Sequence, residues 1–130
     1  MSAPLAFDYT IVQVVPRVER DERINAGVIL FCPAAAFLGC RIGLDERRLR
    51  ALAPDVDVAA VNAQLDAIRA ICAGDAGAGP IARMSPSERF HWLSTPRSTV
   101  VQASPPHAGL CEDPTAALDR LFAASVATPA

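Results

Sequence analysis

The stretch from Phe7 to Leu44 constrains the fold most, because it holds three apolar segments joined by connections too short to contain a helix. The segments are Phe7 to Val15, Ile24 to Cys32 and Phe37 to Leu44. Their β-branched and aromatic residues predict strands. Parallel neighbours need a crossover of a dozen residues or more, so these short connections predict an antiparallel meander.

Prolines mark the expected ends of the first two strands. Pro16 follows the first segment and Pro33 follows the second, and proline cannot donate to a sheet ladder. In the third segment, apolar residues alternate with glycine and arginine between Leu38 and Leu44. This period of two predicts a strand that buries one side only.

Helix start signals and apolar spacing dominate the second half. The predicted helices follow Asp45, run over about 57–73, run over about 85–94, and follow Asp113-Pro114. Ser85-Pro86-Ser87-Glu88 combines an N-cap, a proline at the first helical position and a capping-box glutamate. Between the last two helices, Thr99 to Ala103 is predicted to return as a fourth strand, either within the meander or across a dimer.

The order of elements predicts an α+β fold, an antiparallel three- to four-stranded meander with helices packed on one face. The length of 130 residues predicts one domain, with a core of about 7–126 and a flexible link at about 74–80. Hydrophobic residues make up 52% of the chain and charged residues 20%, which favours a packed core over disorder.

Charge and residue usage exclude several classes of chemistry. The 12 basic and 14 acidic residues give a net charge of −2, so a polyanion such as nucleic acid is not the expected partner. Every basic residue is arginine, and the chain contains no lysine. This excludes a Schiff-base lysine, a P-loop lysine and a kinase-type ATP lysine within this chain.

The hydrophobic pattern predicts neither a membrane span nor a secretory signal. The longest nearly apolar stretch, Ala26 to Cys40, has about fifteen residues interrupted by Pro33, whereas a span needs about 20. The first ten residues lack a basic start followed by a long apolar run. We therefore expect no membrane partner and a cytoplasmic location.

The four cysteines predict neither a metal site nor a disulfide framework. Cys32, Cys40, Cys72 and Cys111 form no C-x-x-C pair and have no nearby histidine pair. We expect free thiols that pack as small hydrophobic groups. No dinucleotide, P-loop or other cofactor motif is present, so no cofactor is expected.

Two polar clusters are candidate binding sites. The first contains Glu22, Arg23, Asn25 and Gly27, and alternation along a strand places Asn25 and Gly27 on one face. An asparagine inside a sheet needs a partner for its amide, and a glycine in a strand often marks close approach of a ligand or another backbone. The competing interpretation is a charged hairpin that is simply solvated.

The second cluster surrounds Arg97, which lies among serine and threonine residues. The planar guanidinium can hold a phosphate or carboxylate, although one arginine in such a loop is also ordinary surface chemistry. His107 follows in a proline-rich loop, where it is a candidate general base that lacks a visible partner. His91 is expected to be a packed or surface histidine in a helix.

Four stretches together resemble a bacterial family catalogued as domain-of-unknown-function family 3037. They are YTIVQVVP, ERINAGVILF, STPRSTVVQASPP and EDPTAALDRLF, and the resemblance covers roughly Tyr9 to Val126. Its most specific part is the E-R-x-N-x-G-V pattern from Glu22 to Val28. The resemblance implies a small bacterial protein without an assigned activity, encoded in association with HipA-like kinases.

These observations leave more than one functional hypothesis open. The favoured one is a non-enzymatic accessory or protein-interaction domain that partners a HipA-like kinase. The alternative is an enzyme or binding protein for a small anionic metabolite or nucleotide. In it, Arg23, Asn25 and Arg97 converge on one pocket, with Glu22 or His107 as proton carrier. A homodimer is also compatible with the pattern. Nucleic-acid binding is least favoured, because the arginines of the first cluster alternate with acidic residues.

Overall fold

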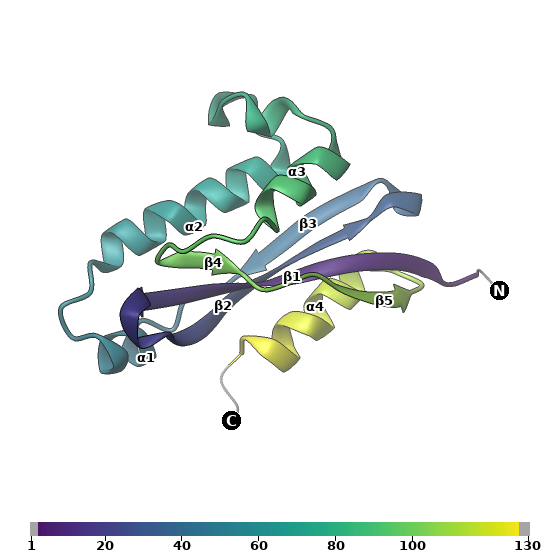
Figure 1. Cartoon of the computed structure of the whole chain (residues 1–130). Helices are drawn as coiled ribbons and strands as arrows, with labels where there is room; N and C mark the ends of the chain where they lie inside the picture. Colours follow the sequence, from purple (N-terminus) through teal and green to yellow (C-terminus); the bar gives the residue numbers. More distant parts are fainter. Residues whose placement is uncertain (1–2, 128–130) are drawn as a thin grey trace.

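An antiparallel sheet of five strands forms the centre of the fold (Figure 1). The structure is a computed structural model, and it describes residues 3–127. The strands are β1 (Leu5–Arg17), β2 (Glu22–Cys32), β3 (Phe37–Ile42), β4 (Val101–Ala103) and β5 (His107–Cys111). Their order is β3-β2-β1-β4, and β5 pairs with the same edge of β1 as β4 does. The predicted meander of the first three strands is confirmed.

Four α-helices follow the predicted start signals. They are α1 (Glu46–Leu52), α2 (Val58–Ala73), α3 (Pro86–Leu93) and α4 (Pro114–Ser125). Asp45 and Asp57 accept hydrogen bonds from main-chain N–H groups of α1 and α2, and Ser85 forms a complete capping box with Glu88. These side chains satisfy donors that have no partner within a helix, which is why the local sequence marks the starts so clearly.

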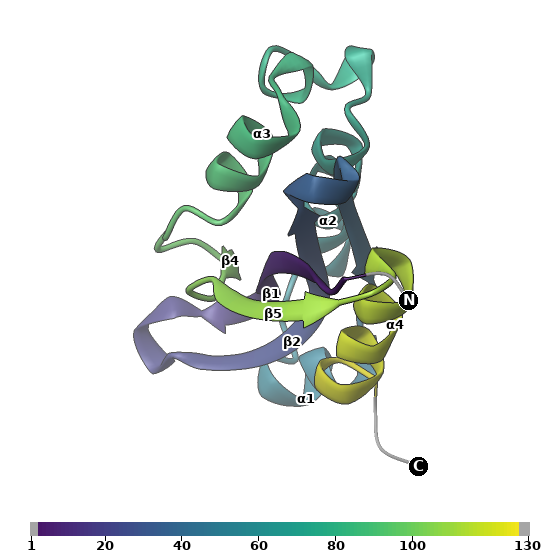
Figure 2. The same cartoon turned by 90° about the vertical axis from the view of Figure 1, so that its right-hand side faces the viewer.

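The α+β class is confirmed, but the helices do not all cover one face. Ile29 of β2 packs in a core with Leu49 of α1 and Leu65 of α2, and α3 contributes to the same core. Leu30, the next residue, packs in a second core with Leu118 of α4. Consecutive strand residues point to opposite faces, so α4 lies on the face opposite α2 and α3 (Figures 1 and 2). A strand buried on both faces reads as a continuous apolar run, which is how β2 reads.

The strand ends differ from the predictions where backbone pairing is irregular. β1 continues through Pro16 to Arg17, whereas Pro16 was expected to end it. The register between β1 and β2 shifts between Val14 and Arg17, so the proline occupies an irregular part of the ladder. β3 ends at Ile42, two residues before the predicted end at Leu44.

The far edge of β1 is completed by two strands that are separated by Pro105 and Pro106. β4 confirms the predicted fourth strand and pairs with β1 of its own chain. β5 was not predicted, since its residues lie in a stretch that reads as a proline-rich loop. At the break, the main-chain N–H of Ile11 donates to the Ser104 hydroxyl at 2.9 Å. Ser104 thereby preserves hydrogen bonding where the two strands are discontinuous.

Four short 3-10 turns complete the connections. They are η1 (Val18–Arg20), η2 (Pro33–Ala35), η3 (Ala76–Ala78) and η4 (Ile81–Arg83). The turn η3 lies inside the segment 74–80 that was expected to be a flexible link, so part of that link has regular structure. Among residues 3–127, no helix has both the length and the apolar character needed to cross a membrane.

Candidate functional site

The first predicted cluster lies at a β-bulge in β2. Val12 of β1 pairs with Gly27, and the next residue, Gln13, pairs with Asn25, which leaves Ala26 as the extra residue. Because Val12 and Gln13 point to opposite faces, their partners do so as well. The prediction that Asn25 and Gly27 share a face is therefore wrong, since an inserted residue cannot be read from local alternation.

Gly27 is explained by the neighbouring strand. A Cβ atom at this position would lie 2.9 Å from Cγ1 of Ile42 and 3.0 Å from the main-chain oxygen of Arg41, both on β3. Such distances are too short for a real side chain. The glycine therefore allows close approach of β3, which is one of the two roles that the sequence suggested.

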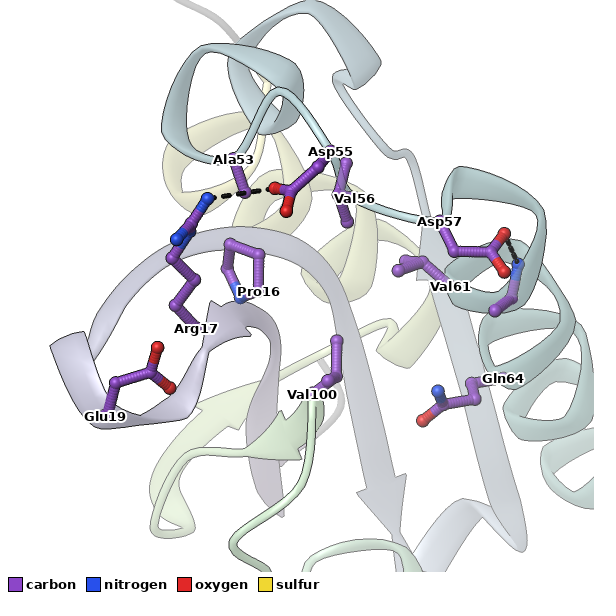
Figure 3. A pocket seen from close by; sticks show the side chains of 11 residues that line it. Pro16, Arg17, Glu19, Ala53, Asp55, Val56, Asp57, Val61, Gln64 and Val100 are labelled. Atoms are coloured by element: carbon purple, nitrogen blue, oxygen red, sulfur yellow. Dashed lines mark hydrogen bonds and ion pairs between the residues drawn. The ribbon is translucent and has the colours of Figure 1, made fainter.

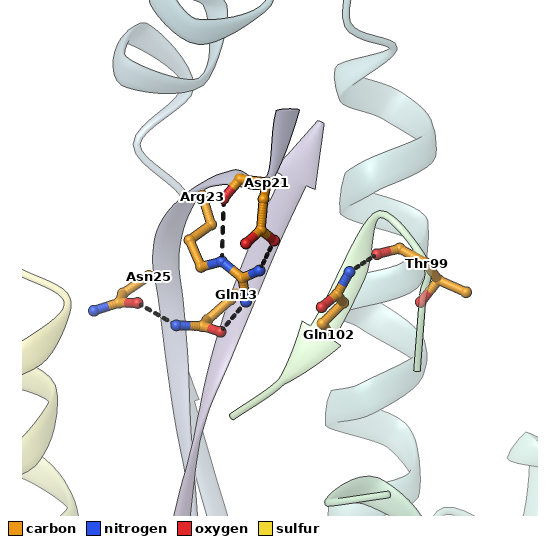
Figure 4. A network of polar contacts seen from close by, with 6 residues as sticks. All are labelled: Gln13, Asp21, Arg23, Asn25, Thr99 and Gln102. Atoms are coloured by element: carbon orange, nitrogen blue, oxygen red, sulfur yellow. Dashed lines mark hydrogen bonds and ion pairs between the residues drawn. The ribbon is translucent and has the colours of Figure 1, made fainter. Parts of the chain in front are cut away.

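Asn25 belongs to a continuous chain of hydrogen bonds on the face that carries α4 (Figure 4). Its side-chain nitrogen donates to the main-chain oxygen of Ser125 at 3.0 Å, and its oxygen accepts from Gln13 Nε2 at 3.2 Å. Arg23 donates to Gln13 Oε1 at 3.0 Å and forms an ion pair with Asp21. The E-R-x-N motif thus connects the β1–β2 hairpin to the end of α4.

The same face presents amide side chains on three adjacent strands. Gln13 pairs in register with Gln102 of β4 on one side and with Asn25 of β2 on the other. We call Asn25, Gln13 and Gln102 the amide row; all three are half-buried. Gln102 donates to the main-chain oxygen of Thr99 at 2.7 Å. Figure 4 shows that α4 lies beside Asn25, with Gln13 and Gln102 farther from the helix.

Arg97 lies on the opposite side of the sheet from the amide row. Its guanidinium carbon is 4.0 Å from the ring centroid of Trp92, and its Nη2 donates to the main-chain oxygen of Trp92 at 2.9 Å. Arg97 lines a recess of about 280 Å³ together with Ile68 and Ile71 of α2. The expected convergence of Arg97 with Arg23 and Asn25 is therefore absent from the fold.

Glu22 and His107 are not brought into a common pocket either. Glu22 forms an exposed ion pair with Arg20, and this hydrogen bond and charge raise the pKa of Arg20. His107 is exposed at the start of β5, where its ring centroid lies 5.3 Å from that of Tyr9. Two of the predicted site residues, Arg23 and Asn25, therefore form one network, and the others lie elsewhere.

A recess that sequence reasoning did not find lies between the β1–β2 hairpin and the connection from α1 to α2 (Figure 3). Its volume is about 390 Å³. Arg17 and Asp55 form an ion pair of 2.9 Å at its rim, and Asp57 accepts from the main-chain N–H of Ala60 at 3.0 Å. These two carboxylates already have structural partners. In the sequence, Asp55 and Asp57 are recognisable only as residues near the start of a helix. The ion pair between Arg17 and Asp55 could not be predicted, because the two residues are far apart in the sequence and meet only in the folded chain.

Sequence reasoning also missed that the cysteines lie in pairs. Cys40 of β3 and Cys72 of α2 line the same recess, and Cys32 of β2 and Cys111 of β5 lie in the same core. A hydrogen bond from Cys72 lowers the pKa of Cys40, and the charge of Arg69 adds to this against the effect of burial. The same hydrogen bond, together with burial, raises the pKa of Cys72. Burial, followed by the nearby Cys32, raises the pKa of Cys111.

The structure leaves all four thiols free, as expected, and three of them are buried. Within residues 3–127, histidine, cysteine, aspartate and glutamate side chains form no group of three or more that could hold a metal ion.

The comparisons with known proteins confirm the family resemblance that four stretches between Tyr9 and Val126 carry. The model of the family described as "Protein of unknown function (DUF3037)" matches residues 9–126. No curated protein and no solved structure matches the chain. The family match covers nearly the whole chain, from β1 through α4. The chain therefore belongs to the DUF3037 family of proteins of unknown function.

Proposed function

We propose that this chain is a non-enzymatic accessory domain that binds another protein through the amide row and the adjacent Arg23. The observation that carries the proposal is the register of Asn25, Gln13 and Gln102 across three strands. A sheet can be stable without such a row, because a half-buried amide side chain lowers stability unless it is hydrogen-bonded. Asn25 and Gln13 have partners within the chain, and a partner surface would add a hydrogen bond at the side-chain oxygen of Gln102.

The chemistry of the row suits a polypeptide partner. Each amide side chain offers both a donor and an acceptor, as a peptide group does. Gln102 uses its nitrogen for Thr99, which leaves its side-chain oxygen to accept from a partner. The charge of Arg23 is balanced by Asp21, so the surface has no excess charge that would favour a polyanion.

A HipA-like kinase is the partner that we propose to test, since the family resemblance implies an association with such kinases. The alternative of a small anionic ligand had required Arg23, Asn25 and Arg97 in one pocket. Arg97 stacks on Trp92 at α3, whereas Asn25 contacts the end of α4 on the other face. The interaction proposal needs only residues that already lie together.

The test is binding between the purified chain and a HipA-like kinase from the same genome, measured by calorimetry and co-elution. We expect the double variant Gln13→Ala, Gln102→Ala to bind at least about tenfold more weakly, a typical cost of truncating central contact residues. The matched control is Gln64→Ala, which removes an exposed amide at the recess of Figure 3.

Thermal unfolding of each variant separates loss of binding from loss of folding. If the double variant unfolds early, Gln102→Arg serves instead, because it adds bulk to the row and leaves the Gln13 to Asn25 bond in place. A wild-type chain that does not bind the kinase contradicts the proposed partner. Equal binding by wild type and double variant contradicts the proposed surface, and self-association lost in the double variant would identify a second copy as the partner.

A further inference from the structure

Cys40 and Cys72 meet in an open recess between β3 and α2. The two residues are 32 positions apart in sequence, and both line a recess of about 340 Å³ together with Arg69. Cys72 is 2% exposed, whereas Cys40 is half-buried. Cys40 is thus the thiol of the pair that a small molecule in solution reaches first.

The surroundings of the pair divide the two thiols into different chemical roles. The Cys72 thiol lies beside Cys40 in this recess, and hydrogen bonding to it lowers the pKa of Cys40. The guanidinium of Arg69 acts in the same direction. A thiolate is the nucleophilic form of cysteine, and a cation and an S–H donor both stabilise it. Cys72, whose pKa is raised, keeps its proton.

We propose that Cys40 and Cys72 form a redox-active dithiol that a hydroperoxide oxidises to a disulfide joining β3 to α2. Cys40 is the attacking thiol and Cys72 is the resolving thiol. This site is independent of the amide row, which lies on the other face of the sheet. The proposal gives a chemical role to Cys40 and Cys72, which take no part in the proposed interaction with a protein partner.

The reaction balances with the hydroperoxide as the oxidant. The Cys40 thiolate attacks the distal oxygen, the O–O bond breaks, and the departing oxygen takes up a proton to give an alcohol or water. Cys40 then carries a sulfenic acid. The Cys72 sulfur attacks the Cys40 sulfur, the S–O bond breaks, and the hydroxyl leaves as water with the Cys72 proton. The two thiols together lose two electrons and two protons.

The second thiol pair provides a control within the same chain. Cys32 and Cys111 also lie close to each other, but both are buried in the core that α4 covers. Burial raises the pKa of Cys111, so this thiol stays protonated at neutral pH. The proposal therefore predicts oxidation at one pair and not at the other, although both pairs are close in space.

The test is intact-mass and peptide analysis after treatment with one equivalent of hydrogen peroxide at neutral pH. We expect a monomer that has lost two hydrogens and contains a Cys40–Cys72 link, which a dithiol reductant reverses. Trypsin alone cannot assign the link, because Cys32 and Cys40 lie on the same peptide, 24–41. Chymotryptic cleavage after Phe37 separates these two cysteines.

Variants identify the role of each thiol. Cys72→Ser should stop oxidation at a Cys40 sulfenic acid, which dimedone labels, and Cys40→Ser should abolish the reaction. Cys111→Ala is the matched control and should oxidise at the wild-type rate. Four free thiols after treatment, a Cys32–Cys111 link, or a product joined between chains would each overturn the proposal. Disulfide mapping of the wild-type protein shows which cysteines are linked even if a variant fails to fold.

Discussion

The side-chain nitrogen of Asn25 donates a hydrogen bond of 3.0 Å to the main-chain oxygen of Ser125, the last residue of α4. The last carbonyl groups of a helix have no partner within the helix. Asn25 satisfies one of them and holds α4 against the sheet, where Leu118 completes the second core. Asn25 therefore has a structural role in the attachment of α4, and Gln13, the next member of the amide row, lies beside it.

Replacing Asn25 with alanine should lower the free energy of unfolding by about 1 kcal/mol. The change removes the bond to Ser125 and the acceptor for Gln13 Nε2. Urea denaturation measures the effect. Asn62→Ala is the control, since Asn62 makes a single 3.4 Å bond to Glu46 on the surface and its loss should cost less than about 0.5 kcal/mol. Equal effects of the two substitutions would show that Asn25 does not secure α4.

Ser104→Ala should destabilise the protein by about 1–3 kcal/mol, because the main-chain N–H of Ile11 loses its acceptor at a half-buried position. Hydrogen exchange should locate the defect. Relative to wild type, the exchange rate should increase at the Ile11 amide and should not change in the centre of β2. The exposed Ser98→Ala is the matched substitution and should leave both measurements unchanged. An unaltered Ile11 exchange rate in Ser104→Ala would contradict the bridging role.

Gly27→Ala should cost about 1–3 kcal/mol, a typical penalty for forcing an extra methyl group into packed structure. The new Cβ would lie 2.9 Å from Ile42 Cγ1, and the main-chain oxygen of Arg41 blocks relief on the other side. At Gly77 the nearest atom, Oδ1 of Asp75, is 3.5 Å away, so Gly77→Ala should be tolerated. Thermal unfolding compares the two, and a Gly27→Ala protein as stable as wild type would show that β3 can move away.

Stability should fall as pH rises above the ordinary thiol value, and Cys111 should account for part of the loss. Burial raises the pKa of Cys111 above the usual 9.0, so the unfolded chain ionises first. The unfolded state then binds fewer protons than the folded state, and the free energy of unfolding decreases with pH. The contribution of Cys111 is fully present below pH 9.0 and is lost as the pH approaches its folded value.

Denaturation of wild type and Cys111→Ala at neutral pH and at about pH 10 tests this contribution, since the shift is a difference in proton binding between the two states. The variant should lose less stability between the two conditions than wild type does. Parallel pH dependences in the two proteins would mean that the buried thiol ionises equally easily in the folded and unfolded chain.

The predictions that succeeded rest on short-range physics. Asp45, Asp57 and Ser85 each cap a helix whose first residues follow directly, so the signal and its effect lie within one turn. The meander followed from connections too short for a crossover. The family could be recognised from four stretches between Tyr9 and Val126, because residue identities alone carry that information.

The arrangement of the candidate site depended on contacts between distant segments. The extra residue Ala26 turns Asn25 away from Gly27, and Ser125, one hundred positions later, supplies its partner. Likewise, Cys40 and Cys72 meet only because α2 packs on β3. Local alternation and spacing do not predict a bulge or which helix covers which face of the sheet. Both depend on how the apolar surfaces of distant segments pack together in the folded chain.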